Sequence, residues 1–452
     1  MPVPTAKTDA DLRERRASAA DTARLFGTVV APFVAVGPIA RRRRMMGLAE
    51  KLQSDAAVVG AVPRLRDRYG EGPLPMSVPG RALAIVLSSR DVDRILRTET
   101  HAFTAANKEK VAALSPFQPR GVLISRGDIR AQRRALNESA LEPEHALHHL
   151  AGELTPIIEV EAQTLVRHAA CRGEVAAPDF VRAWWRLVRR ITFGDAARDD
   201  TTLTDELWTL RSNGNWSFAH PVRHRLRDRF GERLHRSVAD APSTSLAGVI
   251  RDLPAPASVD AVGQIPHWLF AFDAAGMVAA RTLAVLSTHP EQRARVAAEQ
   301  AAAAPGAPRT LDYLRGCVLE ATRLWPTTPV ILRDSVTETT WEDSKGSYTI
   351  PAGTAFVILS SAFHRADDLP FADTFEPEIW LDGRAEQYPQ LVPFSAGPTA
   401  CPGRNIVLFA VSTFLSRLLD DAEFTLVSDV KPDPGAPLPV TFDNFGLRFA
   451  VQ

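Results

Sequence analysis

The chain has 452 residues, with 53 basic and 53 acidic side chains, 45% hydrophobic residues and three cysteines. This length can bury a large core without disulfide support, and the composition excludes disordered and fibrous classes. A formal charge of zero lacks the basic excess of most nucleic-acid binders, so we expect no nucleic-acid partner. The cysteines are too few and too scattered for an iron–sulfur cluster or a cysteine-rich zinc site, and they suit a reducing cytoplasm.

The N-terminal region carries the strongest membrane-like signal of the chain. Its first residues are polar and lack the apolar core of a signal peptide. Leu25–Ala40 is apolar, but Pro32 and Pro38 interrupt it, and it is shorter than the roughly 20 residues that span a bilayer. One interpretation is an interfacial anchor flanked by Arg41–Arg44, and the other is a packed arm with solvated arginines. We expect the packed arm and no membrane association.

The remaining elements follow from apolar spacing and turn residues. We expect a strand at Arg81–Ser88 and two strands about the Pro-Ala-Gly turn of Tyr348–Leu359. A helix within Val296–Pro308 should end at its Pro-Gly pair. Apolar spacings of three and four predict further helices over Ser125–Leu141, Asp179–Gly194, Pro266–Thr288, Leu311–Leu324 and Arg404–Leu419.

No internal repeat or long low-complexity linker divides the sequence. We therefore predict a mainly α fold with a small β subdomain. Residues 51–452 are expected to form a single domain, and residues 1–50 an N-terminal arm whose structure the sequence leaves open.

A loop punctuated by Gly and Pro, Phe394–Val407, holds Cys401 just before an apolar helix. Unpaired N–H groups and the helix dipole at this position favour a thiolate, which is the form of cysteine that binds metals. Gly397 and Gly403 remove side chains on either side of the cysteine, so that backbone could approach a flat, bulky group. Taken alone, the same residues also fit a small buried cysteine beside a tight turn.

Glu320 and Arg323 stand three residues apart on an otherwise apolar helix, which places both charges on one face. Two charges in such surroundings need each other or further partners, which indicates a buried ion pair that organises the fold. The alternative is an ordinary surface pair. Cys317 on the same helix, and Cys171 elsewhere, are expected to be inert.

The two patterns together, Phe394-x-x-Gly397-x-x-x-Cys401-x-Gly403 and Glu320-x-x-Arg323, resemble the haem-binding loop and the ExxR helix of the cytochrome P-450 family of haem-thiolate monooxygenases. The resemblance runs from about residue 60 to the end of the chain, and Phe375–Trp380 resembles the family's meander motif. It implies the cytochrome P-450 fold, haem b as the cofactor, and Cys401 as the ligand of the haem iron. Phe394, Gly397 and Gly403 would then shape the cofactor loop, and Glu320 and Arg323 would be structural.

The same resemblance assigns the two haem propionates to arginines. Arg134 and Arg333 match positions that hold propionates in the family. Arg130 departs from the usual His or Trp, although a guanidinium also binds carboxylates. Thr399 stands where a basic residue is usual, which removes one expected contact. Ile379 replaces the usual meander arginine, which leaves open what completes the Glu320–Arg323 network.

The helix predicted over Pro266–Thr288 carries small residues from Ala271 to Ala280, which would let its backbone pass close to a porphyrin. A tightly packed core helix explains the alanines equally well. The family's Ala-Gly-x-acid-Thr motif fits Ala275–Ala279 by its letters, but this register loses both acid and alcohol. Counting back from His289 instead places Asp273 at the acid and Ala274 at the threonine. We prefer this second register, with Asp273 either delivering protons or forming a salt bridge in the core.

Ala274 has no hydroxyl to order water beside bound dioxygen, so three functions stay open. The first is a monooxygenase that uses dioxygen and external electrons to oxidise, or oxidatively couple, a small organic substrate of secondary metabolism. The second is a haem-thiolate enzyme that uses peroxide or catalyses a non-oxygenative reaction. The third is a non-catalytic haem-binding accessory protein.

No GxGxxG motif follows a predicted strand, so we expect no built-in nicotinamide or flavin domain. Electrons would then come from a ferredoxin and a ferredoxin reductase. The resemblance places Thr104–Phe117 and Asn213–Pro221 near the substrate entrance. There Phe117, Trp216 and Phe218 indicate an apolar pocket that tolerates aromatic groups.

Two further clusters are interpreted as surface features. His145 and His149 stand four apart on an expected helix, a spacing that can bind zinc, but neither an HExxH motif nor a second ligand cluster accompanies them. Arg223–Arg236 alternates basic and acidic residues and is typical of an exposed amphipathic helix. A docking surface for an acidic electron donor is the alternative.

Overall fold

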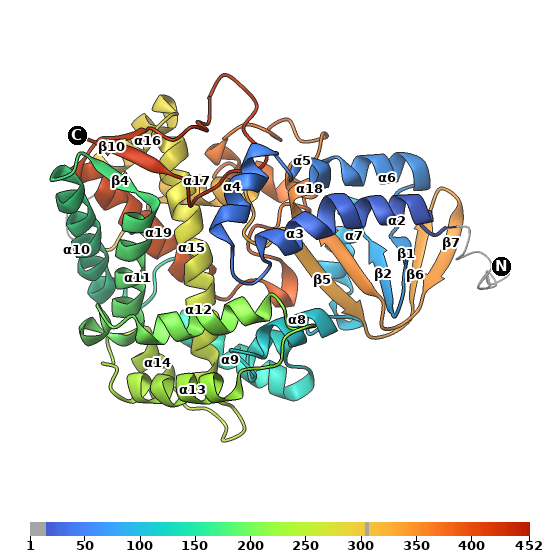
Figure 1. The fold of residues 1–452 in the computed structure, drawn as a ribbon, viewed down its shortest axis with the longest axis horizontal. Helices are drawn as coiled ribbons and strands as arrows, with labels where there is room; N and C mark the ends of the chain where they lie inside the picture. The colour runs from blue at the N-terminus through green and yellow to red at the C-terminus, as the bar shows by residue number, and fades with distance from the viewer. Residues whose placement is uncertain (1–14, 303–306) are drawn as a thin grey trace.

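The computed structural model describes residues 15–302 and 307–452. Figure 1 shows a large helical region on one side, and a sheet covered by the N-terminal helices on the other. The first helices are α2 (Ala19–Leu25), α3 (Ala31–Val36), α4 (Arg43–Lys51), α5 (Ala56–Val59), α6 (Ala61–Tyr69), α7 (Ser89–Asp93), α8 (Lys108–Leu114), α9 (Gly127–Leu141), α10 (Ala151–Ala170) and α11 (Ala177–Phe193). They are followed by α12 (Thr202–Gly214), α13 (His224–Ala239), α14 (Leu246–Asp252), α15 (Ile265–Leu286), α16 (Pro290–Ala301), α17 (Asp312–Leu324), α18 (Ser360–His364) and α19 (Arg404–Asp421).

Short 3-10 and π segments join or extend these helices. They are η1 (Phe26–Val30), η2 (Arg94–Thr98), η3 (Thr100–Ala102), η4 (Val122–Ile124), η5 (Asp195–Ala197), η6 (Val262–Gln264), η7 (Pro377–Trp380), η8 (Arg384–Gln387) and η9 (Gly397–Thr399).

The main sheet has five strands in the order β1-β2-β8-β5-β3, and in it β2 and β8 run parallel while the other neighbours are antiparallel. Two smaller sheets have the orders β4-β10-β9 and β6-β7. The strands are β1 (Leu74–Val78), β2 (Arg81–Ile85), β3 (Phe103–Thr104), β4 (Glu174–Ala176), β5 (Val330–Ser335), β6 (Thr339–Asp343), β7 (Gly346–Ile350), β8 (Ala355–Leu359), β9 (Phe424–Leu426) and β10 (Arg448–Val451).

Helix α15 runs through the helical region, where α11, α17 and α19 pack around it (Figure 1). Its sequence is apolar on nearly every side, which is the pattern of a helix buried in a core. Helix α19 is also largely buried, and it begins directly after the loop that holds Cys401. The two helices therefore position the candidate site between them and the sheet.

The structure confirms the mainly α fold with a small β portion, and each predicted core helix begins and ends within two residues of the expected range. The two strands expected about the Pro-Ala-Gly turn are β7 and β8, and they pair with different neighbours. Helix α16 ends at Ala301, ahead of the Pro-Gly pair. Pro305 and Gly306 of that pair lie outside the described residues.

The N-terminal arm packs against the sheet. Ala17, Leu25 and Val29 belong to the same buried cluster as the sheet residues, as the packed-arm interpretation predicts. Two stretches have the length and hydropathy to cross a membrane, Ala19–Val36 and Val262–Leu286. The second is 72% buried as the core helix, whereas the first is 22% buried.

Candidate functional site

The loop around Cys401 is held by its own backbone. The Cys401 N–H donates to the Phe394 carbonyl at 2.9 Å, which closes the loop before α19 begins. Gly397 has φ +61°, and a Cβ there would lie 1.9 Å from the Leu96 carbonyl oxygen. A Cβ at Gly403 would lie 3.8 Å from the Cys401 sulfur. Glycine is therefore required at position 397 by backbone contact, and at position 403 it leaves open space beside the thiol.

Burial raises the pKa of the Cys401 thiol above its usual value. The Gly403 N–H and the charges of Arg134 and Arg404 act in the opposite direction and do not compensate. In the protein without a metal, burial therefore outweighs the groups that favour a thiolate. A metal cation at the sulfur would remove the proton outright.

A group of cations lies beside this loop. Arg333 is 5% exposed and donates to the hydroxyls of Ser395 at 3.2 Å and Thr399 at 2.6 Å. Arg134 donates to the Ala400 carbonyl at 2.6 Å, and Arg130 reaches the Pro398 carbonyl at 3.3 Å. The predicted propionate arginines thus converge on the Cys401 loop from α9 and β5.

The charges of this group are not balanced by nearby acids. Burial and the charge of Arg130 lower the pKa of Arg333 to about 10. Burial and the charge of Arg333 lower the pKa of Lys110 to about 7. Within the described residues Arg333 has no carboxylate partner, whereas Arg134 pairs with Glu138 at 2.5 Å. A cofactor with two carboxylates fits this site because it would supply the missing negative charge.

The hydroxyl of Thr399 takes a different role from the basic residue usual at its position. Instead of contributing a charge, it accepts from Arg333 and fixes the direction of that guanidinium. Thr399, which replaces the usual basic residue, therefore helps to hold Arg333 in position.

Glu320 and Arg323 form a fully buried ion pair at 2.6 Å, which excludes the surface-pair alternative. Arg323 also donates to four backbone carbonyls, those of His364, Phe371, Ala372 and Thr374. Glu320 accepts from the Glu376 N–H and from the Trp380 indole N–H, each at 3.0 Å. Trp380 thus completes the network in place of an arginine, while Ile379 is buried in an apolar cluster.

Helix α15 presents a stripe of partly exposed residues in the interior of the molecule. His267, Ala271 and Ala274 stand at spacings of four and three, and each keeps some accessible surface although the helix is a core element. Small side chains there leave room for a flat group, in line with the predicted oxygen groove. Ala274 carries no hydroxyl at this stripe.

Asp273 lies on a neighbouring stripe and pairs with Arg211 of α12 at 2.7 Å. Arg211 is 2% exposed and also donates to the Ile39 carbonyl. The structure therefore gives Asp273 the salt bridge that was one of its two predicted alternatives. A role in proton delivery stays a prediction.

Sequence reasoning missed Arg211, Lys110 and His267. Arg211 stands 62 residues from Asp273, and no local pattern connects the two. Burial lowers the pKa of His267 to about 4, and its Nδ1 has no partner among the residues that the structure describes. The sequence could have indicated His267, because it is a polar residue within an apolar helix.

The expected substrate-entrance segments lie side by side, since a Cβ at Gly214 would lie 2.4 Å from the Ala113 carbonyl oxygen. Phe117 is 1% exposed and packs on Phe270 of α15 with ring centroids 6.0 Å apart. Trp216 and Phe218 are exposed instead. Only Phe117 of the three aromatic residues is therefore buried.

The histidine cluster after α9 does not form the expected helix face. His145 and His149 lie in the turns between α9 and α10. His149 contacts Glu142 at 2.5 Å, and both ring nitrogens of the adjacent His148 have backbone partners. These contacts occupy the ring nitrogens and the carboxylate oxygen that could otherwise bind a metal ion.

Helix α13 matches the prediction of an amphipathic helix, with Phe230 on its buried face.

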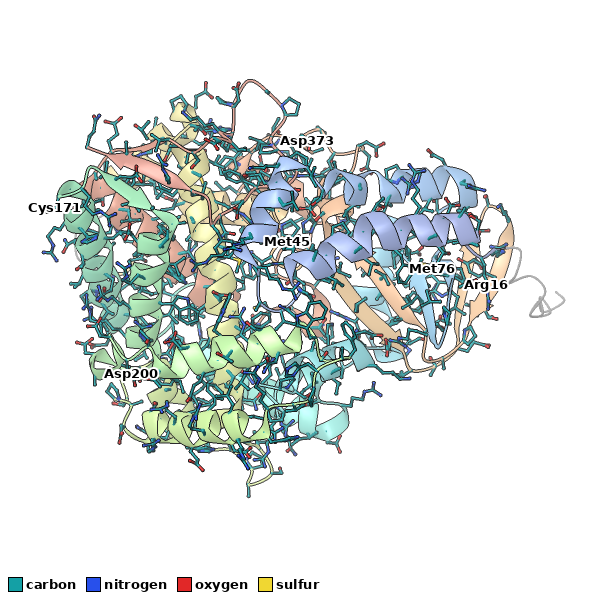
Figure 2. All side chains as sticks on the ribbon, in the orientation of Figure 1. Arg16, Met45, Met76, Cys171, Asp200 and Asp373 are labelled. Atoms are coloured by element: carbon teal, nitrogen blue, oxygen red, sulfur yellow. The ribbon has the colours of Figure 1, made fainter. Side chains whose placement is uncertain are left out.

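The other two cysteines differ in their surroundings. Cys317 is buried on α17, where burial raises the pKa of its thiol. Cys171 is exposed at the end of α10, at the outer edge of the molecule (Figure 2). Neither lies in the Cys401 loop.

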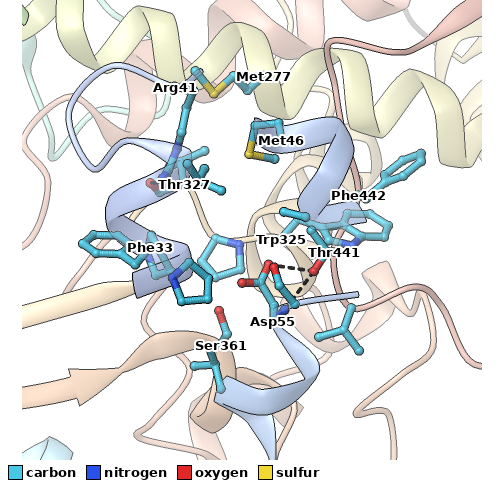
Figure 3. Close-up of a pocket in the computed structure, with 18 of the residues that line it drawn as sticks. Phe33, Arg41, Met46, Asp55, Met277, Trp325, Thr327, Ser361, Thr441 and Phe442 are labelled. Atoms are coloured by element: carbon cyan, nitrogen blue, oxygen red, sulfur yellow. Dashed lines mark hydrogen bonds between the residues drawn. The ribbon is translucent and has the colours of Figure 1, made fainter. Parts of the chain in front are cut away.

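A small cavity of about 70 Å³ separates the N-terminal arm from α15 (Figure 3). Asp55 and Thr441 join across it by two hydrogen bonds of 3.0 and 3.1 Å. Arg41 donates to the Thr327 carbonyl, and Arg281 donates to the carbonyls of Trp325 and Phe442. These buried polar contacts connect the arm to the C-terminal segment.

Comparison with known proteins gives one consistent result. A family model described as Cytochrome P450 matches residues 273–442. Cytochrome P450 4g1 of Drosophila melanogaster is 31% identical over 132 residues, covering 26% of this chain and 23% of that protein. Cyclooctat-9-en-7-ol 5-monooxygenase of Streptomyces melanosporofaciens is 34% identical over 146 residues, covering 29% of this chain and 31% of that protein.

The structure titled Retinoic acid bound cyanobacterial CYP120A1 superposes with a TM-score of 0.69 at 18% identity. The match covers 86% of this chain and 93% of that chain. At this identity the superposition shows the fold alone.

The fold is mainly α, and the Cys401 loop carries the residues predicted to bind haem. Residues 273–442 match the cytochrome P450 family, whose cofactor is haem b. The matched stretches span 23% and 31% of the two named relatives' own lengths.

Proposed function

We propose that this chain is a haem-thiolate monooxygenase that oxidises, or oxidatively couples, a small organic molecule. The observation that carries the proposal is the convergence of Cys401 with Arg130, Arg134 and Arg333, a thiol and an excess of positive charge in one loop region. Haem iron bound by a thiolate activates oxygen for insertion into organic substrates.

Each site residue then has a role set by its contacts. Cys401 would bind the iron, and Arg130, Arg134 and Arg333 would hold the propionates by charge-assisted hydrogen bonds. Phe394, Gly397 and Gly403, the other residues of the motif, would shape the loop that holds Cys401. Glu320 and Arg323 act at a distance, by fixing the segment that leads into the Cys401 loop.

The distal side supports a second candidate, the use of peroxide or a reaction without oxygen activation. Ala274 offers no hydroxyl, and the Asp273 carboxylate is already paired with Arg211. In the dioxygen reaction Asp273 would have to move protons while keeping this partner, or after releasing it. A hydroxyl of the substrate, or a water held beside Ala274, would take the place of the missing alcohol.

We propose that the electron donors are a ferredoxin and a ferredoxin reductase, because the sequence contains no nucleotide-binding motif of its own. One relative is a monooxygenase of cyclooctat-9-en-7-ol, which supports a substrate from secondary metabolism. Three free cysteines support a cytoplasmic location.

Turnover tests the proposal. The haem-loaded protein is incubated with cyclooctat-9-en-7-ol and a library of apolar alcohols, either with dioxygen, a surrogate ferredoxin and its reductase, or with hydrogen peroxide alone. Oxygenated product in the first reaction supports the monooxygenase, and product with peroxide alone supports the second candidate. Product in neither reaction, with haem bound, contradicts both and indicates a non-catalytic accessory protein.

A further inference from the structure

A cleft of about 330 Å³ opens between α11, α12, α15 and the segment 444–449. In Figure 1, α4 lies above α12 and to the right of α11. The volume is that of a small-molecule site. Six aromatic side chains line the cleft, namely Phe180, Trp184, Trp185, Trp208, Phe445 and Phe449.

The cleft is separate from the Cys401 site. On α15 it is lined by Asp273, Gly276, Met277 and Ala280, at the three- and four-residue spacings of one helical face. The stripe of His267, Ala271 and Ala274 points to a different side of the same helix. Among the described residues that line the cleft, none comes from the Cys401 loop.

The aromatic wall is held in place. The Trp184 indole N–H donates to the Phe272 carbonyl at 2.7 Å, and Trp184 is 1% exposed. Its ring lies so close to α15 that a Cβ at Gly276 would be 2.6 Å from it. Trp184 is thus fixed in the buried part of the cleft, whereas Trp208 of α12 is 38% exposed and leaves ring surface free for a ligand.

Two buried polar atoms of the wall have no partner in the part of the chain that the structure describes. They are Nε of Arg211 and Oδ1 of Asn444, and both side chains are more than nine-tenths buried. A buried donor and a buried acceptor left unpaired each cost free energy. A ligand with one acceptor and one donor would satisfy both.

Among the described charged residues of the cleft, Arg43 and Arg189 have no ion-pair partner, against one such carboxylate, Asp205. Arg43 lies exposed at the rim, stacks on Phe445 at 5.6 Å and has no ion-pair partner within residues 15–302 and 307–452. Asp273 is already neutralised by Arg211. An anionic group of a ligand is therefore favoured at the mouth.

We infer that this cleft is a second ligand site, which takes a flat aromatic acid carrying a hydroxyl group. The rings lie against the exposed face of Trp208, the carboxylate meets Arg43, and the polar substituents meet Arg211 and Asn444. This assignment does not depend on the reaction at Cys401.

Calorimetric titration of the haem-loaded protein with 6-hydroxy-2-naphthoate tests this site. One saturable site is expected. Trp208→Ala removes an aromatic wall and should weaken binding about tenfold, and Arg43→Ala should weaken it about two- to fivefold. Trp216→Ala and Arg44→Ala are the matched controls, because these residues lie outside the cleft, and they should bind the probe as the parent does.

Saturating imidazole, which binds haem iron, separates the two sites. Unchanged naphthoate affinity in its presence is expected for a separate cleft. Loss of naphthoate binding with imidazole, equal affinity of the parent and Trp208→Ala, or no binding to the parent would each overturn the inference.

Discussion

The Cys401 side of the molecule and the α15 side are built differently. On the Cys401 side, Arg323 alone makes six hydrogen bonds, two to Glu320 on the same helix and four to backbone carbonyls at His364 and in 371–374. On the α15 side, Asp273 has one ion pair, with Arg211, and Ala274 has no polar side chain. The Cys401 side is thus held by a dense network of hydrogen bonds, whereas the α15 side is held by few polar contacts between distant residues.

The largest expected effect comes from breaking the network at its centre. Arg323→Ala leaves the Glu320 carboxylate buried without its partner, which should cost about 3–5 kcal/mol of unfolding free energy. We expect little folded protein and little bound haem, as measured by urea unfolding and haem absorbance. Arg295→Ala, which removes an exposed partner of Glu378, is the control and should stay near the parent. Equal stability of the two variants would contradict the role of the network.

A second change tests the loop geometry. Gly397→Ala forces a Cβ against the Leu96 carbonyl at a positive φ, and should cost about 2–4 kcal/mol. Gly80 has φ +72° with open space around it. Gly80→Ala is therefore the matched control and should cost about 1 kcal/mol. Denaturant midpoints measure both, and similar losses in the two variants would show that the close approach to Leu96 does not matter.

Ala274→Thr tests the α15 side, with little expected change in stability. If the protein uses dioxygen and lacks only an alcohol, the new hydroxyl should raise the product formed per electron consumed, by up to about 10²-fold. The measurement is product against reductant consumed, with Ala275→Thr as a control on the neighbouring position. Unchanged coupling with the natural substrate would mean that the missing hydroxyl does not control the reaction.

The smallest effect concerns pH. Burial and the charge of Arg323 lower the pKa of His364 to about 3, while its ring accepts from the Val392 N–H. The unfolded chain takes up this proton near pH 6.5, so the folded state loses stability as pH falls from about 6.5 toward 3. Thermal midpoints should decline over this range, and His364→Gln should decline less steeply. Identical slopes for the parent and the variant would contradict the buried neutral imidazole.

Local patterns predicted much of the Cys401 side. The motif around Cys401 and the Glu320–Arg323 spacing lie within short segments, so the sequence displays them directly. Trp380 could not be predicted as the replacement for the missing arginine, because its indole meets Glu320 across 60 residues of chain. The raised pKa of the Cys401 thiol also escaped prediction, since burial outweighs the helix terminus only once the fold is known.

The α15 side was less accessible to sequence reasoning. The preferred register drew attention to Asp273 as a lone carboxylate within an apolar helix, but its partner Arg211 comes from another helix. The cleft beside it combines residues from α4, α11, α12, α15 and the C-terminal segment, and no single stretch of sequence contains its pattern. Tertiary packing, rather than local preference, creates these features.

The absorption spectrum of the reduced, carbon-monoxide-bound protein tests the central claim most directly. If Cys401 binds haem iron as a thiolate, the parent protein shows the red-shifted band typical of thiolate-bound haem, and Cys401→Ser loses it while Cys317→Ser keeps it. Absence of the band in the parent, or its persistence in Cys401→Ser, would contradict the assignment.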